Sequence, residues 1–109
     1  MNTLKIQRLN DLATSPVRGT EGSVGYDIFA CIDEPKTIPP GETLVIGSGI
    51  AIALEQGFAA FVYARSGLGI KHGIAPANCV GVIDSDYRGE ILVGLRNSSP
   101  TPYTVSPND

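Results

Sequence analysis

Cysteine, histidine and tryptophan are scarce in this sequence of 109 residues, which has two cysteines, one histidine and no tryptophan. Cys31 and Cys79 provide neither a disulfide framework nor the ligand spacing of a zinc site, so we interpret both as buried, reduced thiols. A Ser-His-Asp triad would have to use His72, and a solvated or structural histidine fits that glycine-rich stretch better. Chemistry that depends on a Cys/His cluster is therefore disfavoured.

Long apolar runs and basic clusters are also missing. No stretch approaches the roughly 18 residues of a membrane span, and the first six residues lack the basic and apolar regions of a secretory signal. The net charge is −3 without a run of lysines or arginines, which argues against nucleic acid or an anionic membrane as a partner. We therefore expect a cytoplasmic protein that binds neither.

Glycine and proline, by contrast, are abundant, at 13 and 8 residues. Short β-branched runs lie between these turn formers, and no long segment has a helical period. The length suits one domain, residues 1–109. The pattern predicts an all-β barrel or jelly roll with almost no helix beyond a single turn starting at Ser66. We expect about eight strands, with an edge strand near 4–6 and others at 24–30, 43–46, 50–54, 58–65, 79–83, 91–95 and 103–105.

Arg65-Ser66-Gly67 forms the first cluster of candidate functional residues. A guanidinium, a hydroxyl and exposed backbone N–H groups at the end of a strand are the donors that phosphate oxygens require. The alternative is an ordinary Ser/Gly turn beside a surface arginine. The triplet alone does not decide between them.

Asp84 follows the apolar run 80–83, so its carboxylate is expected where a strand ends, in a position to accept a proton from water. The alternative is turn chemistry, which Asp, Ser and Gly89 all favour. An EF-hand loop is excluded because Leu95 occupies the twelfth position, where a glutamate is needed. Asp27 lies in another strand-like run and is expected on the face opposite Val24 and Tyr26.

Together, Val24–Ala30, Ala64–Gly69 with Lys71–Ile74, and Asn78–Glu90 resemble the first three motifs of the homotrimeric dUTP pyrophosphatase (dUTPase) family, in order and in spacing. Val24 and Ala64 replace an alanine and a proline that are usual there. The resemblance implies a jelly-roll fold, a homotrimer whose active sites collect motifs from more than one chain, and hydrolysis of the substrate dUTP to dUMP and pyrophosphate.

The resemblance also implies a role for each matched residue. Asp84 would be the general base that activates water, and Asp27 would position waters of a Mg²⁺ ion held largely by the substrate phosphates. Phosphate oxygens would be bound by Arg65, Ser66 and Gly67. The base and sugar would be recognised by Asn78, Gly81, Val82, Ile83 and Tyr87, with Tyr87 packed where a 2′-hydroxyl needs space.

The family's fourth and fifth motifs have no counterpart before Asp109, so we expect a chain truncated at its C-terminus and slow turnover by these residues alone. Two alternatives stay open. One is a dCTP deaminase of the same superfamily, although such enzymes typically have Arg-Ser-Ser where this chain has Arg65-Ser66-Gly67. The other is a nucleotide-binding regulatory module with little turnover.

Overall fold

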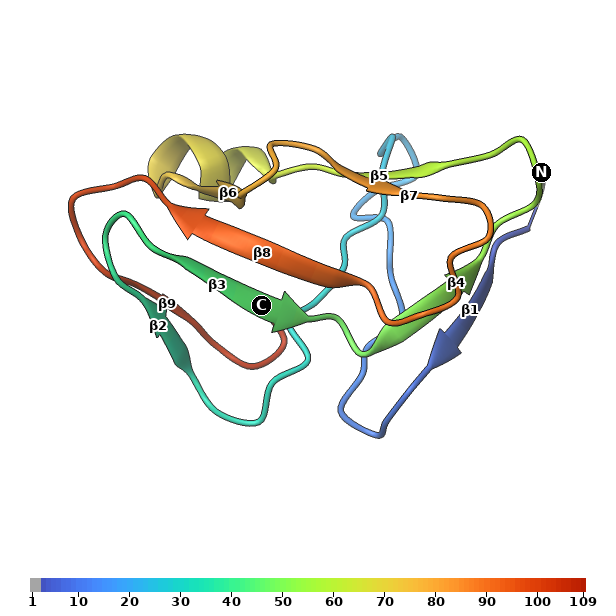
Figure 1. Cartoon of the computed structure of the whole chain (residues 1–109), viewed down its shortest axis with the longest axis horizontal. Coiled ribbons are helices and arrows are strands. Elements are labelled where there is room, and N and C mark those ends of the chain that lie inside the picture. The colour runs from blue at the N-terminus through green and yellow to red at the C-terminus, as the bar shows by residue number, and fades with distance from the viewer. Residues whose placement is uncertain (1–2) are drawn as a thin grey trace.

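Short strands joined by turns make up the fold (Figure 1). The computed structural model describes residues 3–109. No helix in that range is long and apolar enough to cross a membrane. The expected all-β class, with one short helix at the position expected after Ser66, is confirmed. The elements are β1 (Lys5–Arg8), β2 (Lys36–Ile38), β3 (Thr43–Gly47), β4 (Ile50–Ala53), β5 (Ala60–Val62), the π-helical turn η1 (Gly67–Lys71), β6 (Ile74–Pro76), β7 (Gly81–Ile83), β8 (Leu92–Asn97) and β9 (Tyr103–Val105).

Antiparallel pairing connects segments that are far apart in the sequence. β8 pairs with β3 on one side and β6 on the other, and it crosses the middle of the molecule in Figure 1. The remaining pairs are β1 with β4, β2 with β9, and β5 with β7. In the last pair Ala60 faces Ile83 and Val62 faces Gly81, which sets where β7 ends.

The main hydrophobic core gathers around β4. Ile50 and Ile52 of β4 are buried together with Ala13, Leu54 and Ile91. Ile83, the last residue of β7, packs against this cluster. Full burial of an isoleucine or leucine side chain contributes about 1.5–3 kcal/mol, and the packing of the partly buried Ile83 against this core holds the end of β7 in place.

The turn Gly47-Ser48-Gly49, between β3 and β4, is fastened to the residue just before β8. The buried Ser48 donates hydrogen bonds from its backbone N–H and its Oγ to the Ile91 carbonyl, at 3.0 and 2.7 Å. Gly49 has a φ of +70°, and a Cβ atom there would lie 2.6 Å from Cys31 Sγ. Glycine is therefore required at this position, and the entry to β8 is fixed.

The expected strand at 24–30 is wrong. Asp27 forms an isolated bridge with Val17, while Ala30 donates its N–H to the Asp109 carbonyl and Cys31 to the Gly47 carbonyl. Because these partners belong to three different segments, no ladder forms. Val24, which we expected on the strand face opposite Asp27, is fully exposed.

Smaller differences also have local causes. The expected strand 58–65 is reduced to β5, because its partner β7 has only three residues. β2 and β6 were not expected, since each is only three residues long and borders on or contains proline. Both cysteines are free, as expected, but neither is buried: Cys31 is partly exposed and Cys79 is exposed. Cys79 lies in the tight turn between β6 and β7 with a φ of +66°.

Candidate active site

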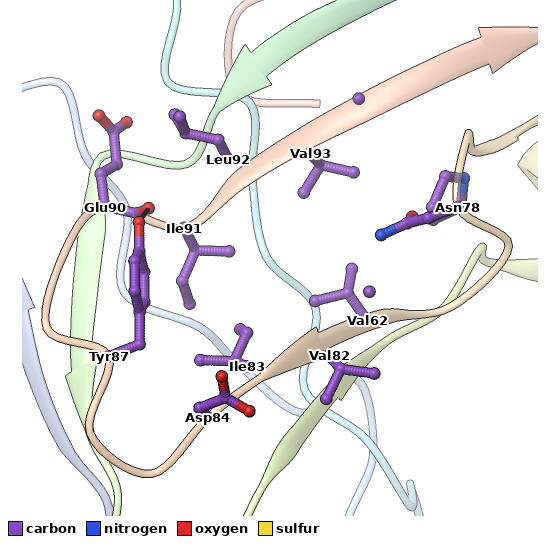
Figure 2. Close-up of a pocket in the computed structure, with 13 residues that line it drawn as sticks. Val62, Asn78, Val82, Ile83, Asp84, Tyr87, Glu90, Ile91, Leu92 and Val93 are labelled. Atoms are coloured by element: carbon purple, nitrogen blue, oxygen red, sulfur yellow. Dashed lines mark hydrogen bonds between the residues drawn. The ribbon is translucent and has the colours of Figure 1, made fainter.

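A pocket of about 220 Å³ opens beside β7 and the loop that follows it (Figure 2). It brings together one complete group of residues that the sequence singled out. These are Asn78, Gly81, Val82, Ile83, Asp84 and Tyr87. The sequence analysis did not single out Glu90, Ile91 and Leu92, which also line it, although Glu90 directly follows the Asp-Ser-Asp-Tyr-Arg-Gly segment.

Asp84 is the first residue after β7, as expected, and its side chain is exposed at the pocket. Pairing of β7 with β5, and packing of the partly buried Ile83 against the core, fix the backbone immediately before it. A turn bond from the Tyr87 N–H to the Asp84 carbonyl, at 3.1 Å, fixes the backbone after it. The carboxylate is thus open to solvent on a constrained backbone, which suits a group that must take a proton from water.

Tyr87 forms one wall of the pocket, with its ring between Asp84 and Glu90 (Figure 2). Its hydroxyl donates a 2.7 Å hydrogen bond to the Glu90 carbonyl. The ring lies so close to Gly89 that a Cβ atom there would be 2.6 Å from the hydroxyl oxygen and 2.9 Å from Cζ. A residue larger than glycine at position 89 would therefore clash with the hydroxyl end of the ring, and the hydrogen bond to Glu90 fixes the hydroxyl itself.

Asn78 enters the pocket from the side opposite Tyr87, with its amide nitrogen directed inward (Figure 2). It lies in the turn before β7, where the Cys79 N–H donates to the Pro76 carbonyl at 2.9 Å. The Gly81 backbone approaches Val62 closely, since a Cβ atom on Gly81 would be 3.3 Å from Val62 Cβ. The pocket thus offers an amide, a close backbone strand and an aromatic wall, which can bind a flat polar ring and its substituent.

Arg65 and Asp27 form a second cluster. Arg65 Nε lies 3.6 Å from Asp27 Oδ1, with the arginine side chain 71% exposed and the aspartate side chain 33% exposed. An exposed pair of this kind is held weakly. Ser66 precedes η1 without a capping hydrogen bond from its side chain, and a Cβ on Gly67 would meet nothing within 4 Å. The Arg65 guanidinium, the Ser66 hydroxyl and the Gly67 N–H are therefore accessible donors for an anion.

The two clusters line different cavities within one copy of the chain, although Val62, Pro76 and Val93 border both cavities. Arg65 and Asp27 line a larger cavity of about 630 Å³, which Asp84, Asn78 and Tyr87 do not line. Ser66 and Gly67 line neither of these two cavities in the described part of the chain. The predicted phosphate-binding residues are therefore separate from the pocket of Asp84.

Tyr103 lines the larger cavity on the side of η1, with its ring centroid 5.2 Å from that of His72. Burial, followed by the nearby negative charge of Asp109, raises the pKa of the Tyr103 hydroxyl above its usual value. The exposed His72 matches the solvated histidine expected from the sequence. Tyr103 therefore stays neutral over the physiological pH range, as an apolar wall of the cavity.

No group of three or more His, Cys, Asp or Glu side chains in residues 3–109 is arranged to hold a metal ion. A cage made of protein ligands alone is therefore not present in this range. A lone half-buried carboxylate such as Asp27 suits a hydrated hard cation that takes its other ligands from water and from a bound polyphosphate. Mg²⁺ is the ion that is commonly bound in this way.

Comparisons with a family model and with curated relatives agree on one family. The dUTPase family model matches residues 11–109. A deoxyuridine 5'-triphosphate nucleotidohydrolase of Nitrosomonas eutropha is 57% identical over 93 residues, covering 84% of this chain and 62% of the relative. The protein of the same name in Neisseria meningitidis serogroup B is 50% identical, covering 93% of this chain and 67% of the relative. The one in a Psychrobacter species is 46% identical, covering 98% of this chain and 74% of the relative.

Solved structures match the fold over its whole length. The dUTPase of phage phi11 of S. aureus has a TM-score of 0.90 at 23% identity, covering 99% of this chain and 84% of that one. The dUTPase of Staphylococcus bacteriophage 80alpha has a TM-score of 0.87 at 22% identity, covering 100% and 85%. A mutant of the phi11 protein coordinates a structural Mg(II) ion. At these identities the likeness concerns the fold, and it confirms the expected jelly-roll class.

Proposed function

This chain belongs to the dUTPase family, and on that basis we propose that it hydrolyses dUTP to dUMP and pyrophosphate. One observation carries the proposal: relatives that are 46% and 57% identical to it over the aligned residues are named deoxyuridine 5'-triphosphate nucleotidohydrolase. The chain spans from 62% to 74% of the length of these relatives. The pocket of Asp84, Asn78 and Tyr87 supports the same activity.

In the proposed reaction, Asp84 accepts a proton from a water molecule, and the water oxygen bonds to the α-phosphorus of dUTP. The bond from the α-phosphorus to the oxygen that bridges to the β-phosphate then breaks, so dUMP and pyrophosphate leave. The exposed carboxylate at the end of β7 supports this role, because water reaches it freely while its backbone is held by Ile83 and Tyr87.

Arg65, Ser66 and Gly67 are proposed to bind the phosphate oxygens. The exposed guanidinium and the hydroxyl that caps no helix are available for this. Asp27 would hold a water ligand of Mg²⁺, and the phosphates would supply the ion's other contacts. When bound, Mg²⁺ offsets the negative charge that builds up on the leaving pyrophosphate. The weak Asp27–Arg65 pair supports an exchange of partners when a nucleotide enters.

The nucleoside is proposed to lie between Asn78 and Tyr87. The amide of Asn78 would bind the polar edge of uracil together with the nearby backbone. The backbone of Gly81, Val82 and Ile83 would lie against the base and leave no room for the methyl group of thymine. Tyr87 would cover the deoxyribose face where UTP carries a 2′-hydroxyl.

The proposed site is completed by another copy of the chain, in a homotrimer. The separation of the Arg65 cluster from the Asp84 pocket supports this arrangement, because a single copy does not bring both to one cavity. Exposed apolar residues near the Arg65 cluster support it as well. Tyr26, Phe61 and Tyr63 are between 56% and 65% exposed, as expected for a face that another subunit covers.

Replacement of Asp84 by asparagine tests the proposal. We expect Asp84→Asn to lower kcat for pyrophosphate release from dUTP by about 10²–10⁴-fold, with nucleotide binding largely kept, because the general base is lost while the shape is retained. Asp86→Asn, two positions along the same loop, is the matched control and should retain activity. Near-normal turnover by Asp84→Asn would remove that residue from the mechanism. Release of ammonia from dCTP would instead identify a deaminase.

A further inference from the structure

The loop 84–90 carries Asp84 and Tyr87, yet most of its own contacts are internal. The Tyr87 N–H donates to the Asp84 carbonyl at 3.1 Å, and Arg88 donates to the Ser85 carbonyl at 2.6 Å. A longer bond of 3.4 Å joins Arg88 to the Leu54 carbonyl beyond β4. Internal bonds of this kind set the shape of the loop but do not set its place relative to the sheets.

Glu90 supplies a stronger connection from the end of the loop. Its Oε2 accepts a 2.9 Å hydrogen bond from the Gly49 N–H, at a partly buried position. The space that the carboxylate fills exists because residue 47 is glycine, since a Cβ atom there would overlap Glu90 Oε2. A carboxylate that accepts from a backbone N–H makes a charge-assisted bond, stronger than a neutral one. The glycine turn and the carboxylate thus fit each other.

The backbone carbonyl of Glu90 makes a second contact, with Tyr87. Its carbonyl accepts the hydroxyl proton of Tyr87 at 2.7 Å. Figure 2 shows the carboxylate of Glu90 turned away from the centre of the pocket, while its backbone lies next to the tip of Tyr87. Glu90 lines the pocket, and its carboxylate acts on the pocket through Tyr87 and the loop because it points away from the pocket centre.

We propose that Glu90 is a positioning residue for the nucleotide reaction. Its side chain fastens the loop 84–90 to the turn Gly47-Ser48-Gly49, and its carbonyl fixes the ring of Tyr87. Together these contacts set the distance between the aromatic wall and Asp84. The inference rests on the proposed function, since the loop carries the proposed general base and the proposed sugar contact. Displacement of a reacting group by about 1 Å can cost on the order of 10²-fold in rate.

The test compares Glu90→Ala with Glu90→Gln, with dUTP and UTP as substrates. We expect Glu90→Ala to lower kcat for dUTP by about 10- to 100-fold and to narrow the ratio of kcat/KM for dUTP over UTP. Glu90→Gln keeps an acceptor oxygen in reach of Gly49 and should restore both. The matched control is Glu55→Ala, because the Glu55 side chain has no hydrogen bond or ion pair within the described range and should change neither.

Hydrogen exchange gives a readout that does not depend on turnover. In Glu90→Ala, the amides of residues 84–90 and of Gly49 should exchange faster than in the starting protein, while those of β3 and β8 stay unchanged. An unaltered dUTP-to-UTP ratio in Glu90→Ala, or a Glu90→Gln variant as defective as Glu90→Ala, would overturn the proposal. If the starting chain does not hydrolyse dUTP, the proposed function fails. Independently of that result, unchanged hydrogen exchange in Glu90→Ala would refute the proposal that Glu90 fastens the loop 84–90 to the turn at Gly49.

Discussion

The Tyr87 side chain makes two contacts that fix its position in the pocket. Its ring must stand against Gly89 to form the pocket wall, and its hydroxyl must reach the Glu90 carbonyl at 2.7 Å. Tyr87 is 44% exposed, so the hydroxyl bond and the close approach to Gly89, rather than burial, constrain the ring. This rigidity is what a pocket needs in order to reject a substrate that differs by one hydroxyl group.

Replacement of Tyr87 should therefore change selectivity more than stability. We expect Tyr87→Ala to narrow the preference for dUTP over UTP, since an open pocket admits the 2′-hydroxyl. Tyr87→Phe keeps the ring without the hydroxyl bond and should retain most of the preference. The measurement is the ratio of kcat/KM values for the two nucleotides in each variant. The same ratio in Tyr87→Ala as in the starting protein would rule out contact between this ring and the sugar.

The turn between β3 and β4 shows how one backbone element supports the site from a distance. Gly49 has a φ of +70°, and added carbon there would meet Cys31 and Ala13 at 2.6 and 2.8 Å. Its N–H is the donor to Glu90, and its neighbour Ser48 holds Ile91. The turn therefore links the core to the segment between the loop 84–90 and β8.

A comparison of Gly49→Ala with Gly57→Ala separates the two reasons for glycine at position 49, which are its positive φ and its close contacts. Both residues have positive φ, but a Cβ on Gly57 meets nothing within 4 Å. We expect Gly57→Ala to lower the free energy of unfolding by about 1–2 kcal/mol from backbone strain. Gly49→Ala should cost about 1–3 kcal/mol more, from overpacking. Denaturant unfolding measures both, and equal losses would show that the contacts with Cys31 and Ala13 relax at no cost.

The elements that the sequence predicted well are those whose side chains alternate over a paired strand. β3, β4 and β9 lie close to the expected ranges, and each places at least one β-branched side chain in the interior: Ile46, Ile50, Ile52 and Val105. Residues 24–30 alternate in the same way, yet their bonds run to three separate segments, which a local pattern does not reveal. The sequence did not reveal the positioning role proposed for Glu90, because its hydrogen-bond partner, Gly49, is 41 positions away. The position of Asp84 was predicted because it depends only on where one strand ends.

On the scale of the whole molecule, the separation of Arg65 from Asp84 makes a prediction about assembly. If the site is shared between copies, the chain should sediment as a trimer of its 11.4 kDa mass. Asp84→Asn and Arg65→Ala chains, each nearly inactive alone, should regain dUTP hydrolysis when they are mixed and reassembled, because some sites then combine an intact Asp84 with an intact Arg65. Mixtures no more active than their parents, with exchange of subunits verified, would place both residues of a site on one chain.

The most direct test of the proposed hydrolysis follows the oxygen of the attacking water. The chain is incubated with dUTP and Mg²⁺ in water enriched in heavy oxygen, and the products are weighed by mass spectrometry. Attack at the α-phosphorus places the heavy atom in dUMP and leaves pyrophosphate unlabelled, and Asp84→Asn should slow formation of both products together. Heavy oxygen in pyrophosphate, or dUTP left intact by the assembled protein, would contradict the proposed hydrolysis.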